Sequence, residues 1–484
     1  MEQFYKQRAH KQMEDLLQNH LGFPSQEYFS PSSSKLHALR ECSDPESVLH
    51  GCYWMHESKF TPELQKLLEP VPVKLVGIPK PLKLWAKHPS KPLVAVPKFF
   101  GLSSCGKAAR DKRTEGTLIQ FSFLEDIVLK PEQELGVSKY LKSMQDWGGG
   151  FFVADCGFGK TVTMARVIYE LGRKAMVVAP NLTLLAQIKT ELERFLPGSQ
   201  IEILQGAVTP KKLEKLQAAT LIVASLCTLA QCVYPPSFWT CVGTVLFDEA
   251  HLMCARTLSA ILPHIPARYL GGFSATPSRR DNLEYVLYWL MGPTAFVYQR
   301  IPSITGKSGT VIVKKVKGPT IVTPFTFQKA GIFGQLLGLV ANHADRNAMI
   351  LHLAIEQCGI RHRVLLLTAF REHAQYLADQ MEKAGVSTVL LLGGKKSKEV
   401  KQEYKCAVAT YNLLELGYDD KTLDTLILCT PKSSIQQTVG RVEREAPGKA
   451  VPIVFDLVDS NSMLQGMWKK RRAFYKSRGF SCTE

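Results

Sequence analysis

The feature that most constrains the fold of this chain is a repeated alternation of short apolar, β-rich runs with helical patterns. From about residue 149, six runs predict strands: GGFFVA, AMVVAP, IEILQG, TLIVASL, GTVLFDEAH and YLGGFSAT. Residues 161–171 and 182–195 predict the helices that connect the first three runs. Such alternation is typical of βαβ units around a parallel sheet. We therefore expect an α/β fold.

A second series of the same kind begins after about residue 300. Its strand-like runs are RVLLLTAF, STVLLLGG, CAVATYN, TLDTLILCT and VPIVFDLVD, with helical stretches such as HAQYLADQMEKAG between them. This series predicts a second α/β domain. The join at roughly residues 295–345 contains GKSGT and the charged VKKVKG, and we expect it to cross the surface.

The first 115 or so residues follow a different pattern. SPSSSK and a proline-dense stretch that ends in VAVPKFFG show no βα alternation, and proline opposes long helices. We expect a small accessory domain with extended segments, and it is a candidate for nucleic-acid binding. A disordered arm is the alternative, but Trp54, Trp85, Phe99 and Phe100 supply the bulk of a core.

Length and composition agree with this organisation. A chain of 484 residues is long enough for about three domains, which we place at 1–115, 116–298 and 299–484. The sequence contains no apolar run long enough to span a bilayer, and its first residues are too polar for a secretory signal. The 12 cysteines form no C-x-x-C pair and no zinc-like spacing. These features favour an intracellular, reducing location without a membrane partner.

The balance of charge favours a polyanionic partner. The net charge is +17, and lysine and arginine bind nucleic acid by displacing the counterions that its phosphates condense. The alternative is that the charge only keeps the protein soluble. The segment KKRRAFYKSR near the C-terminus is expected to bind phosphates, with a solvated helix face as the alternative.

A phosphate-binding loop is predicted after the first strand, in FFVADCGFGKT. Ala154, Gly159, Lys160 and Thr161 fit the spacing of a small residue, four spacers and Gly-Lys-Ser/Thr, between a predicted strand and a predicted helix. Lys160 would place its charge near the terminal phosphates, and Thr161 would hold Mg²⁺. The alternative is an ordinary turn. The predicted nucleotide-binding loop comprises Ala154, Asp155, Cys156, Gly157, Phe158, Gly159, Lys160 and Thr161.

Two adjacent carboxylates end the predicted strand in VLFDEAH. Asp248 is a candidate for holding Mg²⁺, and Glu249 for orienting or deprotonating the water that attacks a phosphate. His251, at the end of the motif, is assigned a coupling role. A solvated strand end with a helix-capping acid is the alternative.

Small hydroxyl residues follow the next predicted strand, in GGFSATPSRRD. Ser274, Ala275 and Thr276 could hydrogen-bond to the acidic motif and relay the state of the nucleotide. A simple turn is the alternative for this segment.

The second domain contains an arginine-bearing helical segment, QQTVGRVER. Gln437, Arg441 and Arg444 would share one face of a helix through their i+4 and i+3 spacings. An arginine on this face could stabilise a transition-state phosphate. A charged face compensated by Glu443 and Glu445 is the alternative.

Taken in order, ADCGFGKT, APNLTLLAQ, DEAH, SATPSRRD, TYNLLELGYD and QQTVGRVER resemble the motifs of DEAH-box-type helicases of superfamily 2. The resemblance covers about residues 116–480. It implies two tandem RecA-like domains, ATP and Mg²⁺ as cofactors, nucleic acid as partner, and ATP binding in a cleft that closes and opens.

The resemblance also assigns roles to single residues. FLEDIVLKPEQ is similar to the segment that recognises adenine, which implies that role for Gln133. Arg441 and Arg444 would contact the nucleotide. The implied contacts to the tracked strand are Asn181, Thr183, Ser225, Thr228 and Thr410; the implied coupling residues are Glu415, Gly417 and Asp419. Cys156, Phe158 and Leu416 depart from the common pattern of the family.

VAVPKFFGL and the C-terminal segment resemble DNA helicases of large DNA viruses, including the poxviral transcript-release helicase, and the phage recombination helicase. This implies a motor on double-stranded or branched DNA, in viral transcription, recombination or repair, with transcription or replication machinery as a further partner. An RNA helicase is the alternative, because phosphate contacts do not separate the two nucleic acids. A non-catalytic scaffold is a third interpretation, against which Lys160, Asp248 and Glu249 argue.

Overall fold

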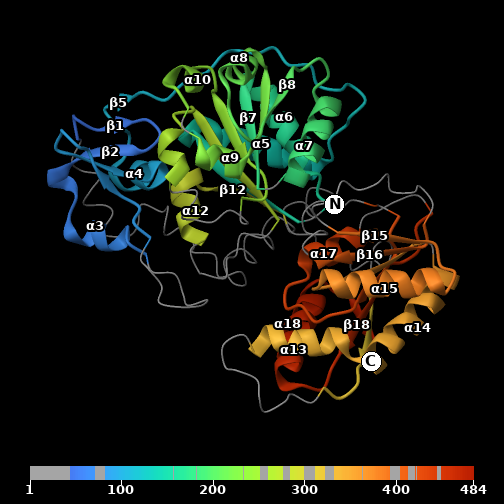
Figure 1. Ribbon diagram of the computed structural model, residues 1–484. Coiled ribbons are helices and arrows are strands. Elements are labelled where there is room, and N and C mark those ends of the chain that lie inside the picture. The colour runs from blue at the N-terminus through green and yellow to red at the C-terminus, as the bar shows by residue number, and fades with distance from the viewer. Residues whose placement is uncertain are drawn as a thin grey trace, which may run out of the picture. The chain divides into compact units, whose positions relative to one another are not determined.

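The computed structural model describes residues 44–70, 82–155, 157–180, 182–232, 234–250, 260–275, 284–298, 311–321, 332–361, 363–392, 404–411, 420, 422–443 and 448–483. The chain divides into two compact units: Met1–Ala154 with Gly159–Tyr298, and Asp155–Phe158 with Gln299–Glu484. Each unit contains a seven-stranded sheet (Figure 1). These sheets confirm the α/β fold with two RecA-like domains. The boundaries after residues 115 and 298 stay predictions.

The main sheet of the first unit is parallel throughout, in the order β12-β6-β11-β10-β7-β9-β8. Its strands are β6 Gly149–Ala154, β7 Ala175–Ala179, β8 Ile201–Leu204, β9 Leu221–Ser225, β10 Thr244–Phe247, β11 Tyr269–Ser274 and β12 Thr294–Tyr298. Its helices are α5 Pro131–Trp147, α6 Lys160–Leu171, α7 Leu182–Phe195, α8 Pro210–Ala218, α9 Leu226–Gln231, α10 Pro236–Thr240 and α12 Glu284–Met291, with a 3₁₀ turn at Leu262–His264. All six predicted strands and both predicted helices are confirmed.

The sequences of these strands explain their central place. Every residue of β6, β7, β9 and β10 is buried. Strands covered by helices on both faces have continuous apolar runs rather than alternating ones, and such runs are the pattern that predicts these strands from the sequence. Since all strands are parallel, their carboxyl ends lie along one edge of the sheet, where ligands of α/β proteins bind.

The accessory region forms a small mixed sheet in the order β3-β4-β2-β1-β5. Its elements are β1 Val48–Leu49, β2 Tyr53–His56, a 3₁₀ turn at Glu57–Lys59, α3 Pro62–Leu67, β3 Ala86–Lys87, β4 Leu93–Val96, α4 Lys98–Cys105 and β5 Arg110–Asp111. Phe99 and Phe100 on α4 are buried, and the Phe100 ring lies edge-on to Trp289 of α12 at 5.1 Å. Figure 1 shows α4 beside α12, so this small sheet shares a core with the main sheet of the first unit.

The sheet of the second unit is also parallel, in the order β15-β16-β14-β17-β18-β13-β19. Its strands are β13 Ile312–Lys317, β14 Val364–Thr368, β15 Thr388–Leu391, β16 Cys406–Thr410, β17 Thr425–Leu428, β18 Ile453–Val458 and β19 Ser481–Thr483. Its helices are α13 Ile332–Asn342, α14 Ala344–Ile360, α15 Arg371–Lys383, α17 Gln436–Val442 and α18 Ser462–Ser477. The five strands predicted for this domain are confirmed.

One prediction for this unit was wrong. VKKVK, expected in a surface join, is most of strand β13, which pairs with β18 on one side and β19 on the other. Val313 is fully buried, whereas the Lys314 ammonium lies over the Phe455 ring. The charged residues concealed the strand because a lysine can cover apolar surface with its methylenes while its ammonium reaches water.

In the part of the chain that the structure describes, no helix combines the length and the apolar character that crossing a membrane requires.

Candidate functional site

The predicted phosphate loop lies between the carboxyl end of β6 and the first turn of α6, as the motif requires. Gly157 and Gly159 adopt left-handed backbone conformations, with φ of 82° and 92°, which residues with a Cβ rarely adopt. Gly159 is also the N-cap of α6, so Lys160 and Thr161 are its first two residues. A helix N-terminus points free N–H groups at its ligand and favours an anion there.

Lys160 and the acidic motif meet at this edge of the sheet. The Lys160 Nζ lies 3.7 Å from Glu249 Oε1 and donates a hydrogen bond of 3.3 Å to the carbonyl of Ala154. Asp248 is buried, and its N–H donates to the carbonyl of Val178 at the end of β7. The two motifs, far apart in sequence, are therefore neighbours in space.

Glu249 has an unusual backbone. Its φ of 45° is the only positive value for a residue other than glycine in the described part of the chain. Such strain persists where the surrounding structure imposes it, and it gathers at functional sites. The conformation turns the chain sharply after β10 and places the Glu249 carboxylate near Lys160.

The buried acidic pair suits a divalent cation. Burial and the neighbouring Glu249 raise the pKa of Asp248 to about 7, although the charge of Lys160 opposes the shift. A cation beside both carboxylates would remove this penalty, and Mg²⁺ prefers such oxygen donors together with hydroxyls. The Asp248 carboxylate and the Thr161 hydroxyl are therefore oxygen donors that fit Mg²⁺, with Glu249 beside them.

Gln133 lies in the first turn of α5, against the phosphate loop. It is buried, and its Oε1 accepts a hydrogen bond of 2.9 Å from the N–H of Lys130 in a capping box. A Cβ built on Gly159 would lie 2.6 Å from the Gln133 Nε2. The side chain thus packs on the phosphate loop, while adenine recognition stays a prediction.

Other predicted residues of the first unit lie at or near the ends of further strands of the main sheet. Ser225 ends β9 and Ser274 ends β11, and both are buried, as is Ala275. Thr228 is also buried, and its hydroxyl accepts a hydrogen bond from the N–H of Gly206 at 3.0 Å. That bond ties α9 to the segment after β8, a structural use that sequence reasoning missed. Thr183 lies in the first turn of α7.

In the second unit, Thr410 is buried at the end of β16, and α17 carries Gln437 and Arg441. α17 ends at Val442. Some residues with predicted roles lie outside the described part of the chain: Cys156, Asn181, His251, Thr276, Glu415, Gly417, Asp419 and Arg444.

The expectation for the basic C-terminal segment needs a correction. Arg471 is buried, and its guanidinium holds both carboxylate oxygens of Asp456 at 2.7 and 2.8 Å. The hydroxyl of Tyr475 donates to the same carboxylate. Arg471 therefore fixes α18 to the sheet and cannot bind a phosphate; the exposed cations of the segment are Lys469, Lys470, Arg472 and Lys476.

Comparison with known proteins agrees with these features. Residues 126–279 match the family model described as "Type III restriction enzyme, res subunit". The chain is 24% identical over 404 residues to a "Putative ATP-dependent RNA helicase" of Acanthamoeba polyphaga mimivirus, covering 80% of this chain and 75% of the relative. It is 23% identical to a "Probable helicase" of Escherichia phage T5, covering 67% and 71%.

Among solved structures, the crystal structure of T4 UvsW matches 90% of this chain and 98% of its own, with 17% identity and a TM-score of 0.37. The family match and the viral relatives confirm the resemblance that the six motifs indicated.

Proposed function

We propose that this chain, which is an ATP-hydrolysing helicase of the superfamily 2 type, acts on double-stranded or branched DNA. The proposal rests on one observation above all. Lys160 on the phosphate loop and the Asp248–Glu249 pair lie within reach of one another at the carboxyl edge of a parallel sheet. A loop that binds phosphates beside an acidic pair is the arrangement that phosphoryl transfer to water requires.

The residues of this site divide the work. The backbone N–H groups at the start of α6 and the Lys160 ammonium bind the phosphates, and Thr161 and Asp248 hold Mg²⁺. Bound Mg²⁺ would neutralise the charge that develops on the phosphate oxygens. Glu249, held by its strained backbone, orients the attacking water or accepts its proton.

The remaining roles follow the helicase resemblance. Gln133 recognises the adenine, and Gln437, Arg441 and Arg444 act on the nucleotide. Ser274, Ala275 and Thr276 relay its state, together with His251, Glu415, Gly417 and Asp419. The proposed contacts to the tracked strand are Asn181, Thr183, Ser225, Thr228 and Thr410.

DNA is the preferred substrate because two segments of the sequence, VAVPKFFGL and the C-terminal helix, resemble viral and phage DNA helicases. We place the protein inside an infected cell or a virion, in transcription, recombination or repair. RNA is the second candidate, since the mimivirus relative carries the name of an RNA helicase.

The test is ATP hydrolysis by the purified chain and by Lys160→Ala, at low salt and with Mg²⁺. Each is measured alone and with duplex DNA, branched DNA, single-stranded DNA or RNA. We expect DNA to stimulate the wild type, and Lys160→Ala to lose at least about 100-fold in kcat, because one phosphate-binding charge is worth several kcal/mol in the transition state.

Lys142→Ala is the matched control. Lys142 forms an exposed i,i+4 pair with Asp146, so this variant should hydrolyse ATP like the wild type. Stimulation by RNA alone would replace DNA with RNA as substrate. Hydrolysis that survives in Lys160→Ala would show that the phosphate loop is not the site.

A further inference from the structure

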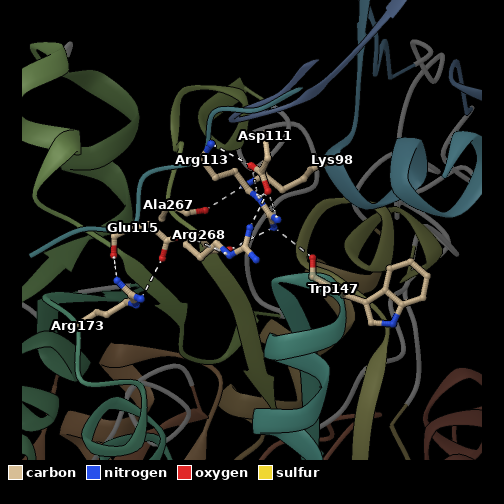
Figure 2. Close-up of polar contacts among 8 residues, drawn as sticks. All are labelled: Lys98, Asp111, Arg113, Glu115, Trp147, Arg173, Ala267 and Arg268. Carbon is tan, nitrogen blue, oxygen red and sulfur yellow. Dashed lines mark hydrogen bonds and ion pairs between the residues drawn. The ribbon is translucent and has the colours of Figure 1, made fainter. Parts of the chain in front are cut away.

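The accessory sheet is joined to the first unit's main sheet by two cations that sequence reasoning did not single out (Figure 2). Lys98 is the first residue of α4, and Arg113 follows β5 by two residues. Arg113 reaches the starts of both β6 and β11, and Lys98 reaches the start of β11. These strands carry, at their other ends, the phosphate loop and the Ser274–Ala275 segment.

The start of β6 is held by three contacts. Arg113 Nη1 donates to the carbonyl of Trp147, the last residue of α5, at 3.3 Å. Gly148, with φ of 76°, leaves room for that guanidinium, since a Cβ there would lie 2.0 Å from Nη1. A Cβ on Gly149 would lie 2.1 Å from the Phe99 ring, so α4 touches the first residue of the strand.

The start of β11 is held by both Lys98 and Arg113. The Lys98 ammonium donates to the carbonyls of Ile265 and Ala267, at 3.4 Å each, and Arg113 Nη1 donates to the carbonyl of Arg268 at 3.4 Å. The main chain adds to this, because Thr114 pairs with Ala267 as an isolated parallel bridge. Ile265, Ala267 and Arg268, just before β11, are thus fixed from the accessory side.

Charge keeps Arg113 in place. Asp111 accepts from Arg113 Nη2 at 2.7 Å and from Arg268 Nη1 at 2.6 Å, as Figure 2 shows. Burial alone would raise the pKa of Asp111, but the two guanidinium groups outweigh it and hold the pKa below its usual range. The carboxylate therefore stays charged at any pH at which the enzyme works, and it orients Arg113 toward the strand starts.

Burying the charged side chain of Lys98 at this position costs free energy. The side chain is fully enclosed, and burial together with the neighbouring Arg113 lowers its pKa to about 7, with Cys52 and Asp111 opposing the shift. Burial, and then the charges of Lys98 and Lys112, lower the pKa of the nearby His50. A methionine would fill similar volume without burying a charge. The Lys98 ammonium donates hydrogen bonds to two backbone carbonyls just before β11, and an apolar side chain could not make these bonds.

The two strands transmit this fixation to the ATP site. β6 and β11 are neighbours, paired from Gly149–Leu270 to Val153–Ser274. All of β6 and all of β11 after Tyr269 are buried, and close-packed strands move as stiff units rather than stretching. A shift at the amino ends therefore appears at Ala154, which accepts the hydrogen bond of Lys160.

We propose that Lys98 and Arg113 are positioning residues for ATP hydrolysis: by fixing the amino ends of β6 and β11, they set where the phosphate loop and the Ser274–Ala275 segment lie. This inference rests on the proposed ATP site. It makes the accessory sheet an integral part of the ATPase rather than a separable arm.

The test uses the full chain with Lys98→Met or Arg113→Gln, at a temperature well below unfolding. Both kcat and KM for ATP are measured with saturating DNA, together with the Kd of a fluorescent ATP analogue. We expect KM and Kd to rise about threefold to tenfold and kcat to fall, because misplacement by a fraction of an ångström weakens phosphate contacts. Arg113→Lys should recover part of the loss, since it keeps the charge near Asp111.

Two controls separate positioning from stability. Lys87→Met removes a cation of the same sheet that pairs with Glu57 in solvent, and should change nothing. Leu64→Ala opens a cavity in α3, away from the strand starts, and should lower the Tm while leaving the KM of the folded enzyme unchanged.

The outcomes are distinct. A wild type without ATP hydrolysis, or hydrolysis that survives in Lys160→Ala, would overturn the proposed site itself. An active, Lys160-dependent wild type with normal KM and Kd in both joint variants would overturn only the positioning role, as would an equal rise of KM in Leu64→Ala. If Arg113→Gln does not fold, Arg113→Lys and Lys98→Met decide the question by the same two constants.

Discussion

At the scale of single residues, the candidate site places two carboxylates side by side, where burial makes it unfavourable for both to be charged. Asp248 is buried next to Glu249, and the raised pKa of Asp248 shows that the metal-free site disfavours two negative charges. Residues selected for catalysis commonly lower stability in this way. Sequence could predict both carboxylates, but not the strained φ of Glu249, because that depends on what surrounds the turn.

We therefore predict that Asp248→Asn stabilises the protein while it abolishes ATP hydrolysis. The pKa of Asp248 is about 7 in the folded protein and 3.8 in the unfolded chain. The stability that protonated Asp248 contributes to the folded protein is therefore fully present below pH 3.8 and is lost as the pH rises through 7. Without Mg²⁺, the variant should exceed the wild type by about 1–3 kcal/mol at pH 8, and by much less at pH 5.

The measurement is thermal unfolding of both proteins at the two pH values. Asp146→Asn, at an exposed carboxylate of α5, is the control and should show no such dependence on pH. An equal difference at pH 5 and pH 8 would contradict the assignment of the charge penalty to Asp248.

At the scale of secondary-structure elements, the apolar strands were predictable because burial on both faces produces continuous runs such as FFVA in β6. β13 was missed because its lysines obscure the pattern, and Arg471 on α18 was expected to bind phosphates because burial is not visible in a basic run. The elements themselves follow from local sequence, whereas which of their charged residues are inside depends on partners far along the chain.

A pair of glycines tests how tightly α4 packs on β6. Gly149→Ala should destabilise the protein by about 1–3 kcal/mol, because the new methyl would overlap the Phe99 ring and the Leu270 carbonyl. Gly338→Ala, in the interior of α13, meets nothing within 4 Å and should stabilise by about 0.5–1 kcal/mol through its better helix propensity.

Chemical denaturation of the two variants and the wild type gives both values. A Gly149→Ala variant as stable as the wild type would show that α4 yields, and that the strand start is less firmly held than the contacts indicate.

At the scale of the whole molecule, the net charge of +17 predicts how the motor responds to salt. Each phosphate neutralised by a lysine or arginine releases counterions, so the affinity for nucleic acid, which we propose is DNA, should fall at least about tenfold between 50 and 200 mM salt. The KM for ATP at saturating DNA should change far less, because the phosphate loop is a local site.

The DNA concentration that gives half-maximal ATP hydrolysis, measured across that salt range, checks this prediction. A half-maximal concentration that does not change with salt would mean that the excess charge takes no part in binding.

The sequence by itself determined the strands, through their apolar runs, and it predicted the chemistry: the phosphate loop from its glycines, Lys160 and Thr161, and the acidic pair from two adjacent carboxylates at a strand end. These depend on residues within a few positions of one another, so local pattern suffices. Only the tertiary structure decided that β6 lies beside β11 and that Lys98 reaches a carbonyl 167 residues away. Such contacts arise from crossovers between non-consecutive strands and from shared burial, and neither leaves a periodic trace in the sequence.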